Sequence, residues 1–517
     1  MLTYILRRLL MAVLILFAAT FLVFVLATYS SDPLQQFRES TDPAAKALMQ
    51  ARIEQLNLDV PLIPRYFMWL SGALGCLIPF AGKCDLGTTF QGQEVTEVLL
   101  SSMVQTLMLI TAATILAIVI GVALGVVAAL RQYTVLDYGI TFLAFLFFSL
   151  PSFWIAVLLK EFGAIDFNNF LRDPVVSVGS AVLIGVVSGL FWFIASYGKM
   201  KTRVLLGLFG FVLTAGILLL FSATGWFLQP SLGIPFIGVL GVITALIFTF
   251  LMAGLRDRSA MYSGLSAVVI GLIIYFPIQG LLDQATWLMM LILLILCLAV
   301  GAVNGAVVGR LTRTYDLGQS IKVSLWTSFI VGGLVLLDRF MQTWPAYINN
   351  SRISGRPIAT SNSQTPGLSG DFWLMGIDRF THLILPTIAL TLVALASYSR
   401  YSRASMLEIM SQDYVRTARA KGVSERSVVV KHAFRNALIP LTTLVAFDIG
   451  ALIGGAVITE KVFGFSGMGS LFLSSLGEGD IAPLMGFFLV TGLTAMVFNL
   501  IADLAYSVLD PRVRVKA

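Results

Sequence analysis

The stretch Ser411–Pro440 has the sequence SQDYVRTARAKGVSERSVVVKHAFRNALIP and separates two apolar runs near residues 383–402 and 441–459. Apolar runs of about 20 residues are long enough to cross a lipid bilayer, so this polar stretch is predicted to be a loop between two membrane spans. Eight lysines and arginines lie between Arg400 and Arg435, which is more than a topology signal needs. The stretch therefore invites a functional interpretation.

Local signals predict a helix, a glycine and a second helix within this loop. Ser411 or Asp413 can cap a short helix over residues 414–421, and Gly422 is typical of a helix C-terminus. A second helix is expected to begin at Ser424, with Glu425 or Ser427 as its capping partner, and to run towards Pro440. The first helix spans about two turns and is predicted to lie outside the membrane.

One face of this short helix is suited to contact with another protein. Tyr414, Ala418 and Lys421 share a face by their spacing, and Ala418 and Ala420 are small enough for a partner surface to come close. Two interpretations stay open on physical grounds. The loop is either a docking element for a soluble partner, or a basic segment that sets topology and binds anionic lipid headgroups.

The rest of the chain is strongly apolar. Of its 517 residues, 58% are apolar and 12% are charged, whereas soluble domains are nearer half apolar and a quarter charged. The mean hydropathy of +0.90 agrees. These values predict an all-α integral membrane protein and exclude a soluble enzyme, a disordered scaffold and a secreted disulfide-rich domain. The apolar residues come in runs and do not alternate, which argues against an outer-membrane barrel.

Twelve membrane spans are predicted, with both termini in the cytoplasm. The first runs from Leu9 to Ala27 and is interpreted as a retained span, because it is too long for a typical signal peptide. The others are expected near residues 102–130, 138–159, 175–197, 204–226, 233–254, 261–282, 286–308, 322–342, 383–402, 441–459 and 483–507.

The basic residues support this topology. Inside segments of the predicted topology hold 22 of the 34 lysines and arginines, as the positive-inside rule requires. Topology therefore accounts for the net charge of +7, and we expect no nucleic-acid partner.

A polar segment over residues 29–97 is predicted to lie outside the membrane and to include a helix over Ala44–Leu56. Cys76 and Cys84 both fall here, on the oxidising side, where they either form a small disulfide loop or remain two unpaired thiols. Cys297 lies in an apolar run and is interpreted as a core residue. With two histidines and no His/Cys cluster, we expect no metal site, and no catalytic constellation is found.

The loop Ser411–Pro440 resembles the cytoplasmic EAA loop of ABC-importer permeases, in the form used by the dipeptide, oligopeptide and nickel transporter family. Arg416-Thr417-Ala418 followed by Gly422 matches the position of the E-A-A-x-x-x-G core, and the match continues through His432, Arg435-Asn436 and Pro440. Arg416 and Thr417 replace the Glu and the first Ala of the general signature.

Further motifs are similar to the B-type subunit of the same family, in the family's order. They are Tyr4-Ile5-Leu6-Arg7-Arg8-Leu9-Leu10, Asp85-Leu86-Gly87-Thr88-Thr89, Pro151-Ser152-Phe153-Trp154, His382-Leu383-Ile384-Leu385-Pro386, Ser402-Arg403-Ala404-Ser405-Met406, Glu460-Lys461-Val462-Phe463 with Gly467-Met468-Gly469, and Leu509-Asp510-Pro511-Arg512. The resemblance covers residues 1–160 and 350–517.

The resemblance implies a six-helix, type I permease core divided by an inserted block. The core would comprise residues 1–160, with spans 1–3, and residues 349–517, with the last three spans and the coupling loop 410–440. About six further spans, residues 161–348, would be inserted between them. An even number of added spans leaves the downstream topology unchanged, and the task of this block is not readable from its sequence.

The resemblance also implies a function and a set of partners. The chain would form half of a peptide translocation pathway in the bacterial cytoplasmic (inner) membrane, without hydrolysing ATP itself. Its partners would be a second homologous permease, two cytoplasmic P-loop ATPase subunits or one fused ATPase, and an extracytoplasmic peptide-binding protein. ATP and Mg would be bound by the ATPases, and no cofactor by this chain. Coupling to the ATPase would involve Asp413, Tyr414, Arg416, Thr417, Ala418, Arg419, Lys421 and Gly422.

Polar side chains within the core spans are candidates for lining the pathway, because they are costly in lipid. Asp448 and Asn499 are the two residues so assigned. Two rival classes are a secondary transporter driven by an ion gradient, for which Asp448 would be the coupling carboxylate, and a membrane enzyme acting on lipid-linked substrates. The sequence does not identify the transported solute.

Overall fold

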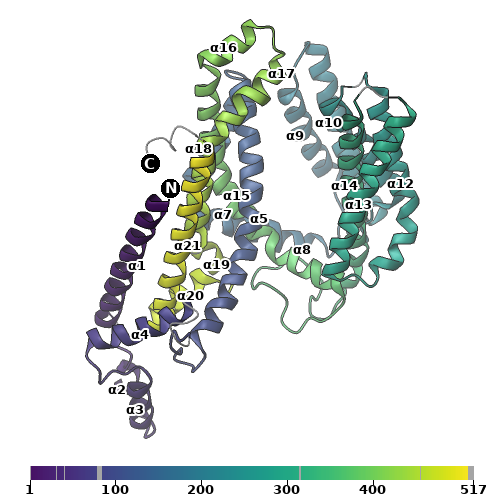
Figure 1. Ribbon diagram of the computed structural model, residues 1–517. Helices are drawn as coiled ribbons and strands as arrows, with labels where there is room; N and C mark the ends of the chain where they lie inside the picture. The colour runs from purple at the N-terminus through teal and green to yellow at the C-terminus, as the bar shows by residue number, and fades with distance from the viewer. Residues whose placement is uncertain are drawn as a thin grey trace. The chain divides into compact units, whose positions relative to one another are not determined.

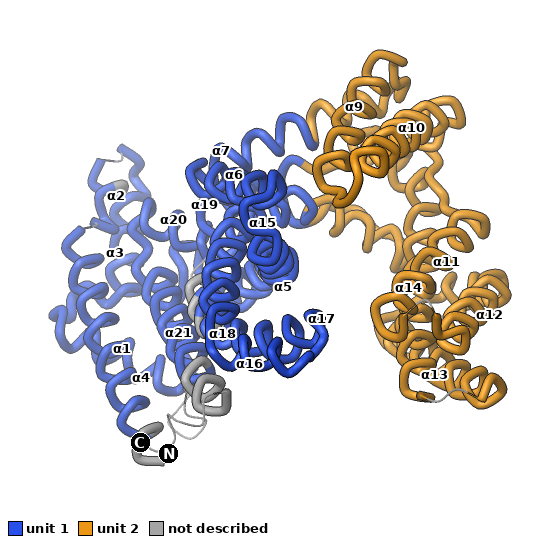
Figure 2. Tube along the Cα trace, turned by 90° about the horizontal axis from the view of Figure 1, so that it is seen from above, with its two compact units in different colours: residues 1–163, 360–363, 383–517 blue, residues 164–359, 364–382 orange. Residues whose placement is uncertain are grey.

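A computed structural model describes residues 2–30, 32–39, 41–77, 84–254, 256–313, 316–453 and 456–509. The described chain is helical, apart from loops and one isolated bridge between Thr88 and Glu94. It divides into two compact units, coloured separately in Figure 2. Unit 1 comprises residues 1–163, 360–363 and 383–517, and unit 2 comprises residues 164–359 and 364–382.

The unit boundaries differ in part from the predicted domains. The first falls between Gly163 and Ala164, three residues from the predicted position. The second is predicted at residue 348, but most of the polar stretch 349–378 belongs to unit 2. That stretch packs on the helix before it and the helix after it.

The helices of unit 1 are labelled in Figure 1 where there is room. They are α1 (Leu2–Ser30), α2 (Gln35–Glu39), α3 (Ala45–Gln55), α4 (Leu62–Leu77), α5 (Val95–Leu130), α6 (Val135–Ser149), α7 (Ser152–Leu158), the π-helix η1 (Leu159–Asp166) as far as Gly163, α15 (Phe372–Met410) from Leu383 onward, α16 (Asp413–Ala420), α17 (Glu425–Ser427), the π-helix η2 (Val428–Phe434), α18 (Arg435–Ile453), α19 (Val457–Phe463), α20 (Met468–Glu478) and α21 (Ile481–Leu509).

Helices α5 and α15 pack closely along their length. A Cβ placed on Gly125 would lie 2.5 Å from the Ser399 carbonyl oxygen, so only glycine permits this approach. One turn away, the Ser402 hydroxyl donates to the Val122 carbonyl at 3.2 Å. Small residues and hydroxyl groups at helix contacts are typical of packing within a bilayer.

The span predicted at residues 138–159 is bent in the structure. Helix α6 ends at Ser149, and the helical segment that starts at Ser152 turns by 102°. Pro151 explains the break, because the residue before a proline is driven out of the helical region, and Leu150 is extended with ψ of 131°. A single straight span is therefore the wrong description of this segment.

Unit 2 consists mainly of long apolar helices. They are α8 (Phe167–Phe170), α9 (Val178–Ala195), α10 (Met200–Thr224), α11 (Gly233–Met252), α12 (Arg258–Leu282), α13 (Trp287–Leu311), α14 (Leu317–Ile348) and the first turns of α15. Helices α9 and α10 pair with each other, whereas α12 and α13 both pack on α14 and α11 contacts α12 and α14. Among α12–α14, the Asn304 amide bonds to Ser263, Ser266 and Ser324.

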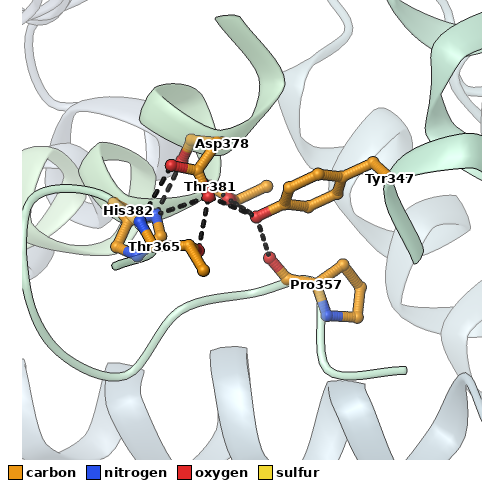
Figure 3. A network of polar contacts seen from close by, with 6 residues as sticks. All are labelled: Tyr347, Pro357, Thr365, Asp378, Thr381 and His382. Carbon is orange, nitrogen blue, oxygen red and sulfur yellow. Dashed lines mark hydrogen bonds and ion pairs between the residues drawn. The ribbon is translucent and has the colours of Figure 1, made fainter. Parts of the chain in front are cut away.

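A buried polar network organises the stretch after α14 (Figure 3). The fully buried Asp378 accepts hydrogen bonds from the Tyr347 hydroxyl at 3.1 Å and from the Thr365 hydroxyl at 2.6 Å. His382 is 5% exposed and its Nδ1 lies 2.7 Å from the Asp378 carbonyl oxygen. His382 therefore belongs to the interior of unit 2, although its position before an apolar run suggests an exposed interface.

The segment predicted to lie outside the membrane is tied to unit 1. Tyr66 of α4 is fully buried against α1, and its hydroxyl lies 2.9 Å from the Thr20 hydroxyl. Helix α3 occupies Ala45–Gln55, within one residue of the predicted bounds. Cys76 and Cys84 form a disulfide bond, with their sulfur atoms 2.05 Å apart.

Ten helices of the described chain are long and apolar enough to cross a membrane, and the bent pair α6 and α7–α8 would make eleven. The twelfth predicted span, residues 441–459, falls on α18 and α19 and includes residues 454 and 455, which lie outside the described residues. The predicted cytoplasmic C-terminal end, residues 510–517, lies outside them as well. The count of twelve and the sidedness of the termini therefore remain predictions.

Candidate functional site

The short helix predicted in the polar loop is present as α16, shifted by one residue at each end. Its N-terminus differs from the prediction, because Gln412 occupies the cap position and makes no side-chain cap hydrogen bond. The Ser411 hydroxyl instead donates to the Glu408 carbonyl at the end of α15, at 2.7 Å. Asp413 is the first helical residue, where its charge favours the positive end of the helix dipole.

The end of α16 is formed as Gly422 predicts. Gly422 has φ of +75°, the left-handed conformation that glycine adopts readily. Its N–H donates to the Arg419 carbonyl at 2.9 Å, and the Val423 N–H donates to the Ala418 carbonyl at 3.3 Å. These two bonds define a Schellman motif, which turns the chain sharply towards α17.

One face of α16 packs on its own chain. Val415 and Ala418 are buried against Val428, with Ile409 and Met410 at the end of α15 completing the cluster. The expectation that Ala418 presents a small exposed surface is therefore wrong, since the alanine faces inward. Its role is to hold α16 in place.

The other face of α16 is exposed and charged. Asp413, Arg416, Thr417, Ala420 and Lys421 are exposed, and the Arg416 side chain is 70% exposed. Tyr414 is also exposed, but its hydroxyl accepts a hydrogen bond from the Asn436 amide at 2.8 Å, which ties the helix to the start of α18. The helix is therefore fixed in position, while the side chains of this face lie outside the apolar cluster around Val415 and Ala418.

A bidentate ion pair stabilises the turn between α16 and α17. The Arg419 Nε and Nη2 atoms donate to the two Glu425 carboxylate oxygens at 3.1 and 2.7 Å. These hydrogen bonds lower the pKa of Glu425 and raise the pKa of Arg419. Glu425 thus pairs with Arg419, and the predicted side-chain cap at Ser424 does not form.

The base of this projection is tied to the start of α6 by an ion pair. Arg403 of α15 donates from Nε and Nη2 to the Asp137 carboxylate at 2.9 and 3.0 Å, and Asp137 is 2% exposed. Asp137 also accepts from the Tyr133 N–H. This pair is not evident from the sequence, because its members are 266 residues apart. In the sequence, the only indication of a role for Arg403 is its place in the family motif Ser402-Arg403-Ala404-Ser405-Met406.

A second candidate site is a cavity of about 450 Å³ among α5, α7, α15, α18 and α19. Asp448 lines it, as do the hydroxyl-bearing residues Thr114, Ser397 and Tyr398. The pathway role of Asp448 stays a prediction, which its place at a cavity wall supports. Asn499 is half-buried on α21 and is not among the cavity-lining residues.

A fully buried carboxylate near this cavity has a structural role. Glu460 of α19 accepts from the Thr106 hydroxyl at 2.7 Å and from the Ser470 N–H at 2.9 Å. The Thr106 hydroxyl in turn accepts from the Met468 N–H at 2.8 Å. Glu460 therefore holds the turn between α19 and α20 against α5. In the sequence, the indication of a role for Glu460 is its place in the family motif Glu460-Lys461-Val462-Phe463, which is followed by Gly467-Met468-Gly469.

Within the described residues, no group of three His, Cys, Asp or Glu side chains is placed to hold a metal ion. What the arrangement provides is a membrane cavity with one carboxylate and, outside the apolar helices, a rigidly held projection with a charged face.

These features define a multi-span membrane protein with a rigidly held, charged projection. Comparison with known families identifies it further. Residues 237–515 match the family described as binding-protein-dependent transport system inner membrane component, and residues 1–110 match that family's N-terminal domain. The chain belongs to this family, the permease subunits of ABC importers, which reside in the bacterial inner membrane and leave ATP hydrolysis to separate subunits.

Individual relatives agree. The chain is 36% identical over 231 residues to the oligopeptide transport system permease protein OppB of Mycobacterium tuberculosis H37Rv, covering 43% of this chain and 69% of OppB. It is 43% identical over 136 residues to the oligopeptide transport permease AppB of Bacillus subtilis, covering 26% and 43% of the two chains. It is 40% identical over 146 residues to the glutathione transport permease GsiC of Escherichia coli K12, covering 28% and 48%.

Proposed function

We propose that this chain forms half of the transmembrane pathway of an ATP-driven importer of di- or oligopeptides. It pairs with a second homologous permease and receives peptide from an extracytoplasmic binding protein. Family membership supports the importer, and the similarity to the oligopeptide permeases OppB and AppB and the glutathione permease GsiC supports a peptide substrate. The cavity beside Asp448 is the part of the pathway that this chain supplies.

We further propose that α16 docks on a cytoplasmic P-loop ATPase, one of two such subunits or half of a fused one, which binds ATP and Mg. The observation that carries this proposal is the division of α16 into two faces. Val415 and Ala418 fasten the helix to its own chain, and the exposed Arg416, Thr417 and Lys421 remain for a partner. A membrane-surface role requires no such rigid mounting.

The mounting also suggests how movement is transmitted. Force on α16 passes through Ile409 and Met410 to the end of α15, because both side chains pack on Val415 and Ala418. Arg403, two turns earlier on α15, is held to Asp137 at the start of α6. A displacement of α16 therefore moves α15 and α6 as coupled rigid helices between two states.

The test is uptake of a labelled tripeptide into vesicles that contain this chain, its permease and ATPase partners, and the binding protein. Uptake should require hydrolysable ATP and persist when ion gradients are collapsed. Uptake that continues without ATP and stops with the gradient would show a secondary transporter instead.

The docking assignment has its own variant test. Arg416→Glu should weaken ATPase association at least tenfold, because it reverses a charge on the docking face. Lys199→Glu reverses an exposed charge in unit 2 and serves as the matched control. Equal association of the two variants would refute the docking role of α16.

A further inference from the structure

The cavity beside Asp448 contains a carboxyl group and, in its described lining, no basic side chain. Its described lining is apolar or hydroxyl-bearing, and no lysine or arginine is part of that described lining. An ionised carboxylate in such surroundings is costly unless a cation or several donors approach it. The site is therefore electrostatically suited to a mobile cation.

Two other buried carboxylates show what a purely structural acid looks like in this chain. Both oxygens of Glu460 accept protein hydrogen bonds, and both oxygens of Asp378 do so as well. Neither residue lines the cavity. Asp448 differs because its carboxylate borders open volume. A carboxylate offers about four acceptor positions, and the described lining places only hydroxyl-bearing and apolar residues beside it.

We propose that Asp448 binds the α-ammonium group of a peptide as it passes through the cavity. This proposal rests on the peptide-import function proposed above and names the group that the site selects. An ammonium supplies three N–H donors and a positive charge, which matches the free acceptor positions of the carboxylate. The cavity volume falls in the range of small-ligand sites, and the hydroxyls of Ser397, Thr114 and Thr459 can bond to the adjoining peptide groups.

The experiment compares two peptides in the complete reconstituted transporter. Trialanine carries the ammonium, and N-acetyl-trialanine replaces it with a neutral amide. Both are supplied at concentrations that saturate the binding protein, so that its own preference is removed. The wild-type transporter should take up trialanine about tenfold faster, because only its ammonium offers a positive charge to the carboxylate.

Asp448→Asn should reduce this preference to about onefold, mainly by slowing trialanine uptake. Thr491→Ala, which removes a hydroxyl of α21 that is not among the described cavity-lining residues, is the control and should keep the wild-type ratio. Tyr398→Phe retains the carboxylate and removes one competing donor, so the preference should be kept or increased.

The outcomes separate the two proposals. If the wild-type transporter takes up neither peptide in response to ATP, the peptide-import function is wrong. If it takes up both at equal saturated rates, the ammonium site is wrong while peptide import stands, and this holds even if Asp448→Asn fails to assemble. An unchanged ratio in an assembled Asp448→Asn transporter overturns the ammonium site as well.

Discussion

Gly422 offers a sharp test of whether the turn after α16 transmits ATP-driven movement. Its φ of +75° is a conformation that costs a residue with a side chain about 1–2 kcal/mol, and β-branched residues are the least tolerant. No atom lies within 4 Å of a Cβ built on this glycine. The effect of Gly422→Val therefore comes from backbone strain and not from a clash.

Relief of this strain requires the turn to open. Opening breaks the hydrogen bonds from Gly422 and Val423 to the last turn of α16, and with them the orientation of the exposed face. If about 1–2 kcal/mol is added to the docked conformation, ATPase affinity should fall about 5- to 30-fold. We expect more ATP to be hydrolysed per peptide imported.

The assay measures ATP hydrolysis and peptide uptake in the same vesicles. Gly422→Asn should behave nearly as wild type, because asparagine tolerates the left-handed conformation. Gly225→Val is the matched strain control, since Gly225 ends α10 with φ of +66° and also has no atom within 4 Å of a built Cβ. A wild-type ratio of ATP to peptide in Gly422→Val would refute the reasoning.

Three further predictions concern stability. Asp137→Asn should lower the free energy of unfolding by about 2–3 kcal/mol by removing the buried partner of Arg403; an unchanged unfolding midpoint in detergent would contradict this. Burial raises the pKa of Asp480 to about 6, so the contribution of this residue to the free energy of unfolding is full below pH 3.8 and is lost as the pH rises through 6. Asp480→Asn should abolish this pH dependence of the free energy of unfolding, measured at a series of pH values, and a pH dependence identical to wild type would argue against it. Cys84→Ser removes a disulfide that joins residues eight apart and should destabilise the 29–97 segment by about 2–3 kcal/mol. The variant should be cleaved faster by a protease, and an unchanged cleavage rate would show that the disulfide does not stabilise the segment.

Hydropathy located the helices but not their ends. The span predicted at 383–402 is part of α15, which runs from Phe372 to Met410, because a helix continues past the lipid when its polar ends find protein partners. The bounds of α16 were predicted to within one residue, since a glycine ends that helix by local conformation alone.

The long-range pairs could not be predicted in this way. Arg403 and Asp137, or Glu460 and Thr106, are hundreds of residues apart, and periodicity within one helix carries no information about them. The inward orientation of Ala418 was likewise hidden, because it depends on where Val428 lies after the turn. Local chemistry therefore predicted the elements, and tertiary packing decided which of their faces remain exposed.

The division of α16 into an apolar inner face and a charged outer face has a consequence for assembly. A subunit synthesised before its partners exposes a charged surface at α16 and not an apolar one. This surface does not promote aggregation in the membrane before assembly. A partner held mainly by exposed charges is also held reversibly, because mobile ions screen such contacts at short range. If α16 docks the ATPase as proposed, the ATPase subunits would dissociate from the permease at high salt concentration and rebind when the salt is diluted.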